Sequence, residues 1–420
     1  MAKGASGLPG FRDFYPEEFA VRAHILNAWR EVARRFGFVE YDGPPLEPLD
    51  LYTKKSGDEI VGQLYNFTDK GDREVALRPE MTPTFARMVA AKANALRKPV
   101  RWFSIPQLFR YERQQKGRLR EHFQLNVDIV GETDVAADAE LVAVAVECMR
   151  AFGLGPQDVR ARVSDRRLLA AILDAIGVSA VQQPGVFAVI DKLDRQPNDV
   201  SAAKLGDLGL PMAAVEQVLA LRELNDADRL RALLGTDGSV TPHIDRMELY
   251  LAHARALGVG DWIDLDLTVV RGLAYYTGIV FELFDVKGEF RAICGGGRYD
   301  SLLGQLGGVD LPALGFGMGD VVLGELLNAR GLAPSTSPTL DVWVAFENEG
   351  DLAKAMRVAT EQRRAGKSVE YALRPMQLGK QLKCATSAGA RVAIILRSEG
   401  SAVKKDLATG AEEPFTLPNG

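Results

Sequence analysis

Five cationic side chains crowd into one short stretch of an otherwise acidic chain. The segment FRYERQQKGRLREHFQ, residues 109–124, holds five arginines and lysines in sixteen positions, whereas the 420-residue chain has a formal charge of -5. Arginine offers a planar fork of donors that matches the geometry of phosphates and carboxylates. A solvated charged loop is the alternative, but Phe109, Tyr111 and Phe123 flank the cations and favour a fixed site. The segment therefore predicts a place where a polyphosphate binds.

No familiar phosphate-binding loop accompanies these arginines. The chain contains no GxxxxGK[ST] motif and no dinucleotide fingerprint, and neither a GxSxG elbow nor an HExxH pair is present. The glycine-rich GGGRYD, residues 295–300, taken alone fits a tight turn between strands equally well. A phosphate-handling enzyme with this sequence must hold its nucleotide on another scaffold.

Predicted strands on both sides would hold the cationic segment as a long hairpin loop. The strands are expected within residues 100–112 and 122–132, where apolar and aromatic residues dominate. Apolar residues at helical spacing predict a first helix over residues 16–37, and Gly37 suits its C-terminal cap. Another helix is predicted over residues 136–153, ending at Gly153.

The texture of the chain changes twice after this region. From about 165 to 255, short Ala- and Leu-rich pieces predict a helical insertion, and strand texture returns over residues 262–286. The stretch LAPSTSPT, residues 332–339, reads as a linker. Beyond it, alternating strands and helices predict a small α/β unit. From residue 338 onward twelve Lys and Arg face ten Asp and Glu, so the mild positive bias lies in this tail.

Composition excludes several classes of protein. The first residues lack the apolar stretch of a secretory signal, and no run approaches the ~18 apolar residues of a membrane span. Cys148, Cys294 and Cys384 are far apart and odd in number, which fits a reducing cytosol without disulfides. With only four histidines, a zinc site is not expected, and no metal ligand is assigned. We expect a cytoplasmic protein with no membrane partner.

Four stretches together closely resemble the histidyl-tRNA synthetase family of class II aminoacyl-tRNA synthetases. FRYERQQKGRLREHFQLNVDIVGE is similar to the motif 2 hairpin, LRPEMTPTFARM is a further matching stretch, and RGLAYYTG and GGGRYD resemble the two signatures particular to the histidine enzyme. The resemblance implies an α+β fold: an antiparallel-sheet catalytic domain over residues 1–331 that carries the helical insertion. It further implies that residues 332–339 are a linker and that residues 340–420 form an anticodon-binding α/β domain.

The implied reaction is ATP-dependent ligation of L-histidine to its tRNA through a histidyl-adenylate. The carboxylate of an amino acid has a pKa of roughly 3.5, so at neutral pH it attacks the α-phosphorus without a general base. What remains is to position two anions and to stabilise charge on phosphoryl oxygens. By resemblance, Arg110 contacts the α-phosphate and Arg271 lies between that phosphate and the carboxylate. Mg²⁺ would accompany ATP, held mainly by substrate oxygens and water.

The resemblance also assigns the remaining site residues. Those for histidine are Glu80, Thr82 and Gln124 near the ammonium, Asp128 and Tyr276 on the ring, with Tyr299, Tyr275 and Arg271 lining the pocket. Those for ATP are Arg110, Glu112 facing the adenine, Arg118, Arg120, Gly317 and Gly319. The acceptor end of tRNA is expected on Arg113, Gln115 and Lys116, and the tail is expected to use Arg374, Lys380 and Lys383. We expect Tyr275 to contribute mainly by packing.

One motif departs from the family pattern. Motif 3 normally carries an arginine that holds the γ-phosphate, and Val322 stands at that position in GFGMGDVVLGELL. Valine cannot contact a phosphate, and Asp320 is expected to repel one. Either another cation, Arg113 or Arg120, takes over the γ-phosphate, or ATP is bound poorly.

This departure leaves two rival functions to weigh. A non-catalytic relative of the family is a histidine-sensing regulatory subunit of ATP phosphoribosyltransferase, which usually lacks the anticodon domain and much of the motif 2 arginine set. A tRNA-binding module without catalysis would have lost Arg110 or Arg271. The chain keeps all of these features, so we favour the synthetase.

The FGFVEYDGPPLEP stretch resembles motif 1, with Pro44 at its proline, and implies a two-fold homodimer.

Overall fold

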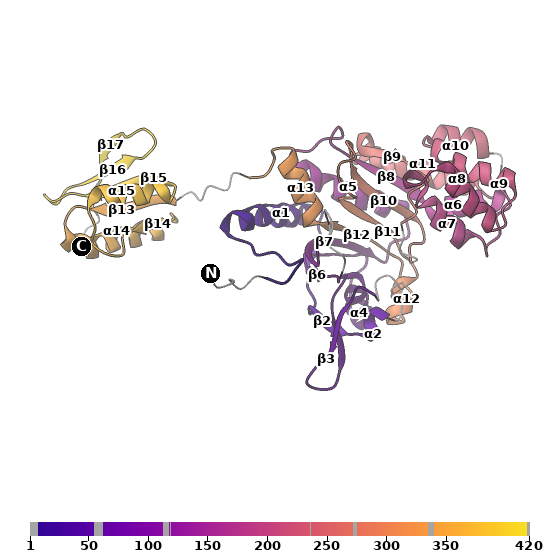
Figure 1. Cartoon of the computed structure of the whole chain (residues 1–420), viewed down its shortest axis with the longest axis horizontal. Helices are drawn as coiled ribbons and strands as arrows, with labels where there is room; N and C mark the ends of the chain where they lie inside the picture. The colour runs from indigo at the N-terminus through magenta and orange to yellow at the C-terminus, as the bar shows by residue number, and fades with distance from the viewer. Residues whose placement is uncertain are drawn as a thin grey trace. The chain divides into compact units, whose positions relative to one another are not determined.

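The computed structural model describes residues 7–53, 62–111, 117, 119–235, 237–271, 275–334 and 340–417. The chain divides into two compact units, Met1–Pro334 and Ser335–Gly420 (Figure 1). None of the described helices is long and apolar enough to cross a membrane. Each unit has its own hydrophobic core and is described by itself.

The first unit is built on a nine-stranded sheet in the order β1-β5-β7-β12-β11-β10-β8-β9, with β6 paired to β7. Its pairs are antiparallel except for β1 with β5 and β8 with β9. The strands are β1 (Val39–Glu40), β5 (Val100–Ser104), β6 (Gln107–Phe109), β7 (Glu121–Val130), β8 (Val159–Asp165), β9 (Ile263–Leu265), β10 (Ile279–Asp285), β11 (Cys294–Arg298) and β12 (Ala313–Gly319). The predicted α+β class is confirmed.

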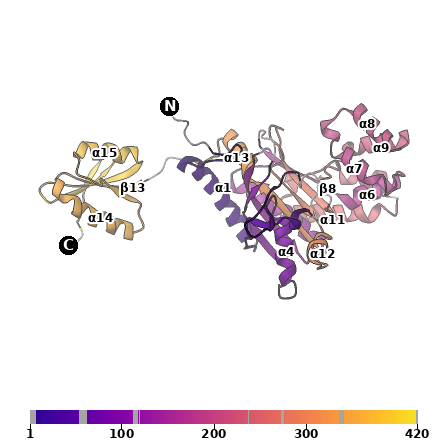
Figure 2. The same ribbon diagram turned by 60° about the horizontal axis from the view of Figure 1, so that its bottom comes forward.

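Three helices pack against this sheet and against one another: α1 (Pro16–Arg35), α5 (Val135–Ala151) and α13 (Asp320–Ala329) (Figures 1 and 2). The apolar positions of α1 recur at helical spacing, and Ile25, Trp29 and Val32 are buried. The α5 helix starts where the side chain of Asp134 accepts a hydrogen bond from the N–H of Ala136, a normal N-cap. These helices close one side of the core.

A small sheet that the sequence did not predict precedes the cationic hairpin. It has the order β2-β4-β3, formed by β2 (Leu46–Pro48), β4 (Glu74–Leu77) and β3 (Tyr65–Thr68). The short α2 (Asp50–Thr53) and the helices α4 (Thr82–Lys92) and α12 (Leu302–Gly307) lie beside it, and α4 packs on α12. This layer places the turn before α4 against the end of β6, where the N–H of Phe109 donates to the carbonyl of Arg78.

Six helices lie in sequence between β8 and β9 and gather beyond that edge of the sheet (Figures 1 and 2). The long α11 packs on α5 and on α6, which fixes this group to the rest of the unit. The helices are α6 (Arg166–Ala175), α7 (Gln183–Ile190), α8 (Asn198–Asp207), α9 (Met212–Ala220), α10 (Ala227–Leu234) and α11 (Thr241–Ala256).

The second unit is a five-stranded sheet in the order β14-β13-β15-β16-β17. Its first three strands are parallel, and Figure 2 shows helices α14 and α15 on opposite sides of them. The elements are β13 (Leu340–Phe346), α14 (Leu352–Arg364), β14 (Val369–Tyr371), α15 (Leu378–Ser387), β15 (Ala390–Leu396), β16 (Ala402–Asp406) and β17 (Glu412–Pro414). It is a small α/β unit, as the alternating sequence texture indicates.

Candidate active site

Two adjoining cavities open on the large sheet, one narrow and one wide. The narrow cavity, about 90 Å³, is lined by Glu80, Thr82, Arg110, Gln124, Asn126, Asp128, Arg271, Tyr275, Tyr276, Gly295, Tyr299, Gly315, Phe316 and Gly317. The wide cleft, about 760 Å³, shares five of these residues with it: Arg110, Gln124, Arg271, Gly295 and Gly317. The two guanidinium-bearing residues with predicted catalytic roles therefore lie where the cavities meet.

Alternate residues of β7 form one wall of the narrow cavity. Gln124, Asn126 and Asp128 are spaced by two, so their side chains leave the same face of the strand. On the neighbouring strand β12, Asp128 is opposite Gly315. A Cβ on Gly315 would lie 2.1 Å from Oδ1 of Asp128, and one on Gly317 would lie 2.8 Å from the Gln124 amide. The glycines are needed because the polar side chains lie flat across β12.

Arg271 lies across β11 in the same way. A Cβ on Gly295 would fall 1.5 Å from its Nη1, so only glycine leaves room for the guanidinium. Nη1 donates to Oε1 of Glu282 at 2.7 Å, and the guanidinium carbon stands 5.5 Å from the ring centre of Tyr276. Burial favours a lower pKa for Arg271, but Tyr276 and Glu282 raise that pKa above its usual value. The group is a fixed cation.

The backbone of Arg271 is strained, and its side chain keeps donor capacity. The backbone φ of Arg271 is +60°, in the left-handed region, which costs a non-glycine residue about 1 kcal/mol or more. Its buried Nε has no hydrogen-bond partner among the residues that the structure describes. A buried donor without a partner is costly, so this atom is suited to an anionic ligand.

A carboxyl group and three tyrosines line the part of the narrow cavity that the wide cleft does not share. The hydroxyl of Tyr299 donates a short hydrogen bond to Oδ1 of Asp128. Burial raises the pKa of Asp128 to about 7, although the bond from Tyr299 opposes that rise. The rings of Tyr275 and Tyr276 are 4.9 Å apart, and those of Tyr275 and Tyr299 are 5.9 Å apart. Asp128 can therefore accept or donate a proton near neutral pH.

Arg110 reaches the cavities from the base of the cationic hairpin. Its Nε donates to the carbonyl of Pro79 at 2.9 Å, which ties it to the turn that carries Glu80. Its backbone N–H donates to the carbonyl of Arg120 at 2.9 Å and closes the hairpin. Thr82, at the first position of α4, completes this side of the narrow cavity.

Some predicted ATP and tRNA residues are placed elsewhere or not described. Gly319 lines only the wide cleft. The Arg120 guanidinium stacks 4.2 Å from the ring centre of Tyr111 and donates to the carbonyl of Pro9, and it lines neither cavity. The predicted residues Glu112, Arg113, Gln115, Lys116 and Arg118 lie outside the described residues.

Asp320, which is expected to repel a phosphate, lines neither cavity and forms an ion pair instead. Asp320 is 4% exposed and forms an ion pair with Nη1 of Arg12 at 3.0 Å. Its Oδ1 also accepts the N–H of Phe123 at 2.8 Å. The partner Arg12 is more than 300 positions earlier in the chain, so no local pattern signalled it. Val322, two residues further on, does line the wide cleft.

Sequence reasoning missed further members of the site, including Asn126, Glu282 and Gly295. Asn126 lies between Gln124 and Asp128 on the same strand face, and the period of two could have found it. Glu282 comes from β10 and Gly295 from β11, and only the strand pairing brings them to Arg271. In the described ranges, no three His, Cys, Asp or Glu side chains lie close enough to form a metal site.

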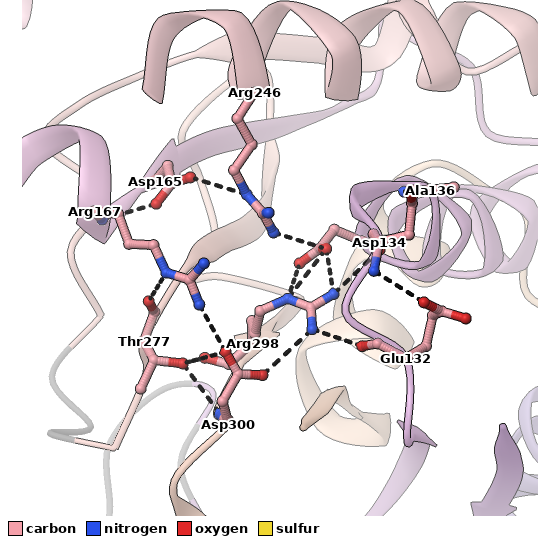
Figure 3. A network of polar contacts seen from close by, with 10 residues as sticks. Glu132, Asp134, Ala136, Asp165, Arg167, Arg246, Thr277, Arg298 and Asp300 are labelled. Carbon is pink, nitrogen blue, oxygen red and sulfur yellow. Dashed lines mark hydrogen bonds and ion pairs between the residues drawn. The ribbon is translucent and has the colours of Figure 1, made fainter. Parts of the chain in front are cut away.

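Figure 3 shows a second cluster of arginines and carboxylates. All three guanidinium nitrogens of Arg298 donate: two to the Asp138 carboxylate, at 2.5 to 3.2 Å, and Nη1 to the carbonyl of Glu132 at 2.8 Å. Arg298 is 1% exposed. Asp300 accepts from Arg298 at 3.3 Å and from Arg167 on α6 at 2.7 Å. This network, here called the Arg298 network, joins β11 to α5 and to the inserted helices.

The sequence of this chain is similar to a known family model and to several known proteins. The family model described as histidyl-tRNA synthetase matches residues 10–319. A histidine–tRNA ligase of Opitutus terrae is 47% identical over 392 residues, 92% of this chain and 90% of that protein. A chloroplastic and mitochondrial histidine–tRNA ligase of Arabidopsis thaliana is 40% identical over 407 residues, 96% of this chain and 83% of that protein.

Two solved structures share the fold. A histidyl-tRNA synthetase from a Nostoc species superposes with a TM-score of 0.84 at 24% identity, covering 98% of this chain and 96% of that one. A Bacillus halodurans protein described as an ATP phosphoribosyltransferase regulatory subunit/histidyl-tRNA synthetase gives 0.78 at 22% identity, covering 95% and 100%. At such low identity these likenesses show the fold alone.

Proposed function

Because the chain belongs to the histidyl-tRNA synthetase family, we propose that it joins L-histidine to its cognate tRNA through a histidyl-adenylate formed from ATP. One observation carries the assignment of the site. All eight residues predicted for histidine line the narrow cavity, and that cavity meets the wide cleft at Arg110 and Arg271. Histidine would occupy the narrow cavity and the ATP phosphates the cleft, so the two anions meet at these arginines.

The part of the narrow cavity lined by Asp128 and the tyrosines suits an imidazole. Asp128 and the hydroxyl of Tyr276 would bind its two ring nitrogens, and Tyr299 orients Asp128 through their hydrogen bond. Glu80, Thr82 and Gln124 stand on the lining of the same cavity and would bind the ammonium group. An analogue without the ring nitrogens would leave these polar groups unpaired, which can give ~10⁴-fold selectivity against that analogue.

The first chemical step needs placement more than proton transfer. A carboxylate oxygen of histidine attacks the α-phosphorus of ATP, the bond to the bridging oxygen breaks, and pyrophosphate leaves. The carboxylate is already ionised, and Arg271 would orient it while Arg110 stabilises charge on the α-phosphoryl oxygens. Mg²⁺ would enter with ATP, bound by phosphate oxygens and water.

The second step transfers histidine to RNA. A terminal hydroxyl of the tRNA attacks the adenylate carbonyl, and AMP leaves. We assign the acceptor end to the hairpin residues Arg113, Gln115 and Lys116. The second unit would bind the anticodon region, since Arg374, Lys380 and Lys383 are all exposed on it and could contact RNA phosphates.

We also propose a homodimer, which has local support. Tyr15, Phe19 and Val39, on or beside α1 and β1, are 68%, 48% and 63% exposed. The β1 strand is at an edge of the large sheet. Large exposed apolar residues beside a sheet edge are typical of an interface. We assign the protein to the cytoplasm, and sedimentation as a monomer would contradict the dimer.

Histidine-dependent exchange of pyrophosphate into ATP tests the first step, and charging of tRNA tests the second. We expect both activities from the purified protein. Exchange that is absent while histidine still binds would instead favour the regulatory relative. Exchange without charging would place the defect in RNA binding and leave the adenylate chemistry intact.

A further inference from the structure

The wall of the wide cleft lacks a cation at the start of α13. Val321 and Val322 line the cleft there, while Asp320 faces Arg12 instead. If the cleft holds the phosphates of ATP, as proposed above, the β- and γ-phosphates need cations from other elements. Arg120, one of the two substitutes expected from the sequence, stacks on Tyr111 outside the cleft.

Arg291 stands beside Val322 in the cleft. Gly117 of the cationic hairpin marks the distance: a Cβ added to it would lie 3.4 Å from Cγ2 of Val322 and 3.9 Å from Cδ of Arg291. The Arg291 stem and the valine therefore flank the same glycine. Arg291 and Arg110 line one cleft, and Arg291 is exposed enough for its guanidinium to meet a ligand.

Ion pairs with Arg330 hold the loop that carries Arg291. The loop joins β10 to β11, and Arg330 forms ion pairs with Asp285 at 2.5 Å and with Glu289 at 3.3 Å. Oδ2 of Asp285 also accepts the N–H of Glu289 at 3.0 Å, and Phe290 packs on the core. A cation on so firmly tied a loop is pre-organised, which lowers the entropy cost of binding a phosphate.

His122 and Arg195 also line the cleft, and His122 does not suit the role. Desolvation and the nearby positive charges of Arg110 and Arg12 lower the pKa of His122 to about 3. Its imidazole is therefore neutral at physiological pH and can only donate an uncharged hydrogen bond.

We propose that Arg291 binds the terminal phosphates of ATP. It would supply the positive charge that is missing at Val322. The guanidinium fork would engage non-bridging oxygens of the β- or γ-phosphate, remote from the attacking carboxylate. It orients the pyrophosphate leaving group and does not touch the α-phosphorus, so it acts mainly on ATP binding.

The test compares nucleotides that differ in their terminal phosphates. Arg291→Ala should weaken ATP binding and raise the KM for ATP in pyrophosphate exchange about 10-fold, the effect of one lost charged hydrogen bond. AMP binding and histidine binding should change less than about twofold, because neither ligand has a β- or γ-phosphate. Arg291→Gln, which keeps the length of the side chain without its charge, should behave like the alanine variant.

Two further variants sharpen the comparison. Lys287→Ala removes an exposed cation from the same loop, outside the cleft lining, and should leave the KM for ATP unchanged. Val322→Arg added to Arg291→Ala should restore much of the ATP affinity, since it returns a cation to the neighbouring position. The wild-type protein must show exchange for these readings, and its failure there would count against the proposed function itself.

The proposal is overturned if Arg291→Ala leaves ATP affinity within twofold of the wild type. Equal losses of ATP and AMP affinity would also overturn it, because they would indicate damage to the adenosine or α-phosphate site. An equal effect of Lys287→Ala would reduce the role of Arg291 to general electrostatics, which likewise contradicts a specific contact.

Discussion

Arg298 and Arg271 lie at opposite ends of the glycine-rich β11 region and are used differently. All three guanidinium nitrogens of Arg298 have acceptors, and the residue is 1% exposed (Figure 3). Arg271 has a single ion pair, with Glu282, and its Nε has no partner among the described residues. Arg298 ends β11, and the half-buried Arg271 lies across the same strand. Only one of them is left with capacity for a ligand.

The difference separates a structural arginine from a chemical one. A buried charge must be paired and hydrogen-bonded, so a complete set of partners, as around Arg298, stabilises one arrangement of the fold. An incomplete set at a cavity wall is tolerated where a substrate supplies the missing acceptors. Three variants test this contrast, beginning with the largest expected effect.

Arg298→Met should lower the free energy of unfolding by about 3–5 kcal/mol, because it leaves the Asp138 carboxylate buried without its main partner. Urea denaturation followed by circular dichroism measures the change. Arg231→Met is the matched control: its ion pairs with Asp245 and Glu248 are on the surface, and the loss should be below about 1 kcal/mol. Similar losses for both variants would contradict the structural role of the Arg298 network.

Gly295→Ala should reduce pyrophosphate exchange about 100-fold with little loss of stability. The new methyl group would collide with the end of the Arg271 side chain, which can swing away. Gly297→Ala is the control within the same motif, since its Cβ would lie 2.5 Å from the carbonyl oxygen of Ile279, which is backbone. That variant should be unstable, and a stable Gly297→Ala with normal activity would contradict the reading of these glycines.

Asp128→Asn should stabilise the free protein while weakening histidine binding. With a pKa of about 7, Asp128 is protonated in the folded state where the unfolded chain, with a pKa of about 4, is ionised. The folded state thus binds more protons between pH 4 and 7, and stability falls as pH rises through that window. Asparagine removes this penalty.

The Asp128→Asn variant should gain about 2 kcal/mol in free energy of unfolding at pH 8, less than the full linkage value because the cavity is open to water. This gain should shrink as the pH is lowered toward 4. Melting curves of both proteins at several pH values measure it. A constant difference across pH would show that Asp128 is not the titrating group.

The parts of the site that could be predicted from the sequence are those carried by local pattern. The helix predicted over residues 16–37 is α1. The strand predicted over residues 100–112 is divided into β5 and β6, and the strand predicted over residues 122–132 is β7. The residues predicted to bind histidine came from short motifs. Residues close together in such a motif also lie close together on a strand, as Gln124 and Asp128 do on β7.

The parts that could not be predicted depend on contacts between distant segments. Arg12 pairs with Asp320, and Glu282 pairs with Arg271 only because β10 and β11 are hydrogen-bonded neighbours. Arg291 had no motif at all, since its position is set by a loop anchored through Arg330. Such pairings follow from tertiary packing, and a single sequence does not reveal them.

The most direct test of the account is single-turnover formation of histidyl-adenylate by Arg271→Ala, with histidine affinity and melting temperature measured on the same preparation. We predict a rate constant lower by about 10²–10³-fold, with histidine affinity and melting temperature close to those of the wild type. An equal fall in rate and in histidine affinity, or a large fall in melting temperature, would make Arg271 a structural arginine like Arg298 and contradict the account.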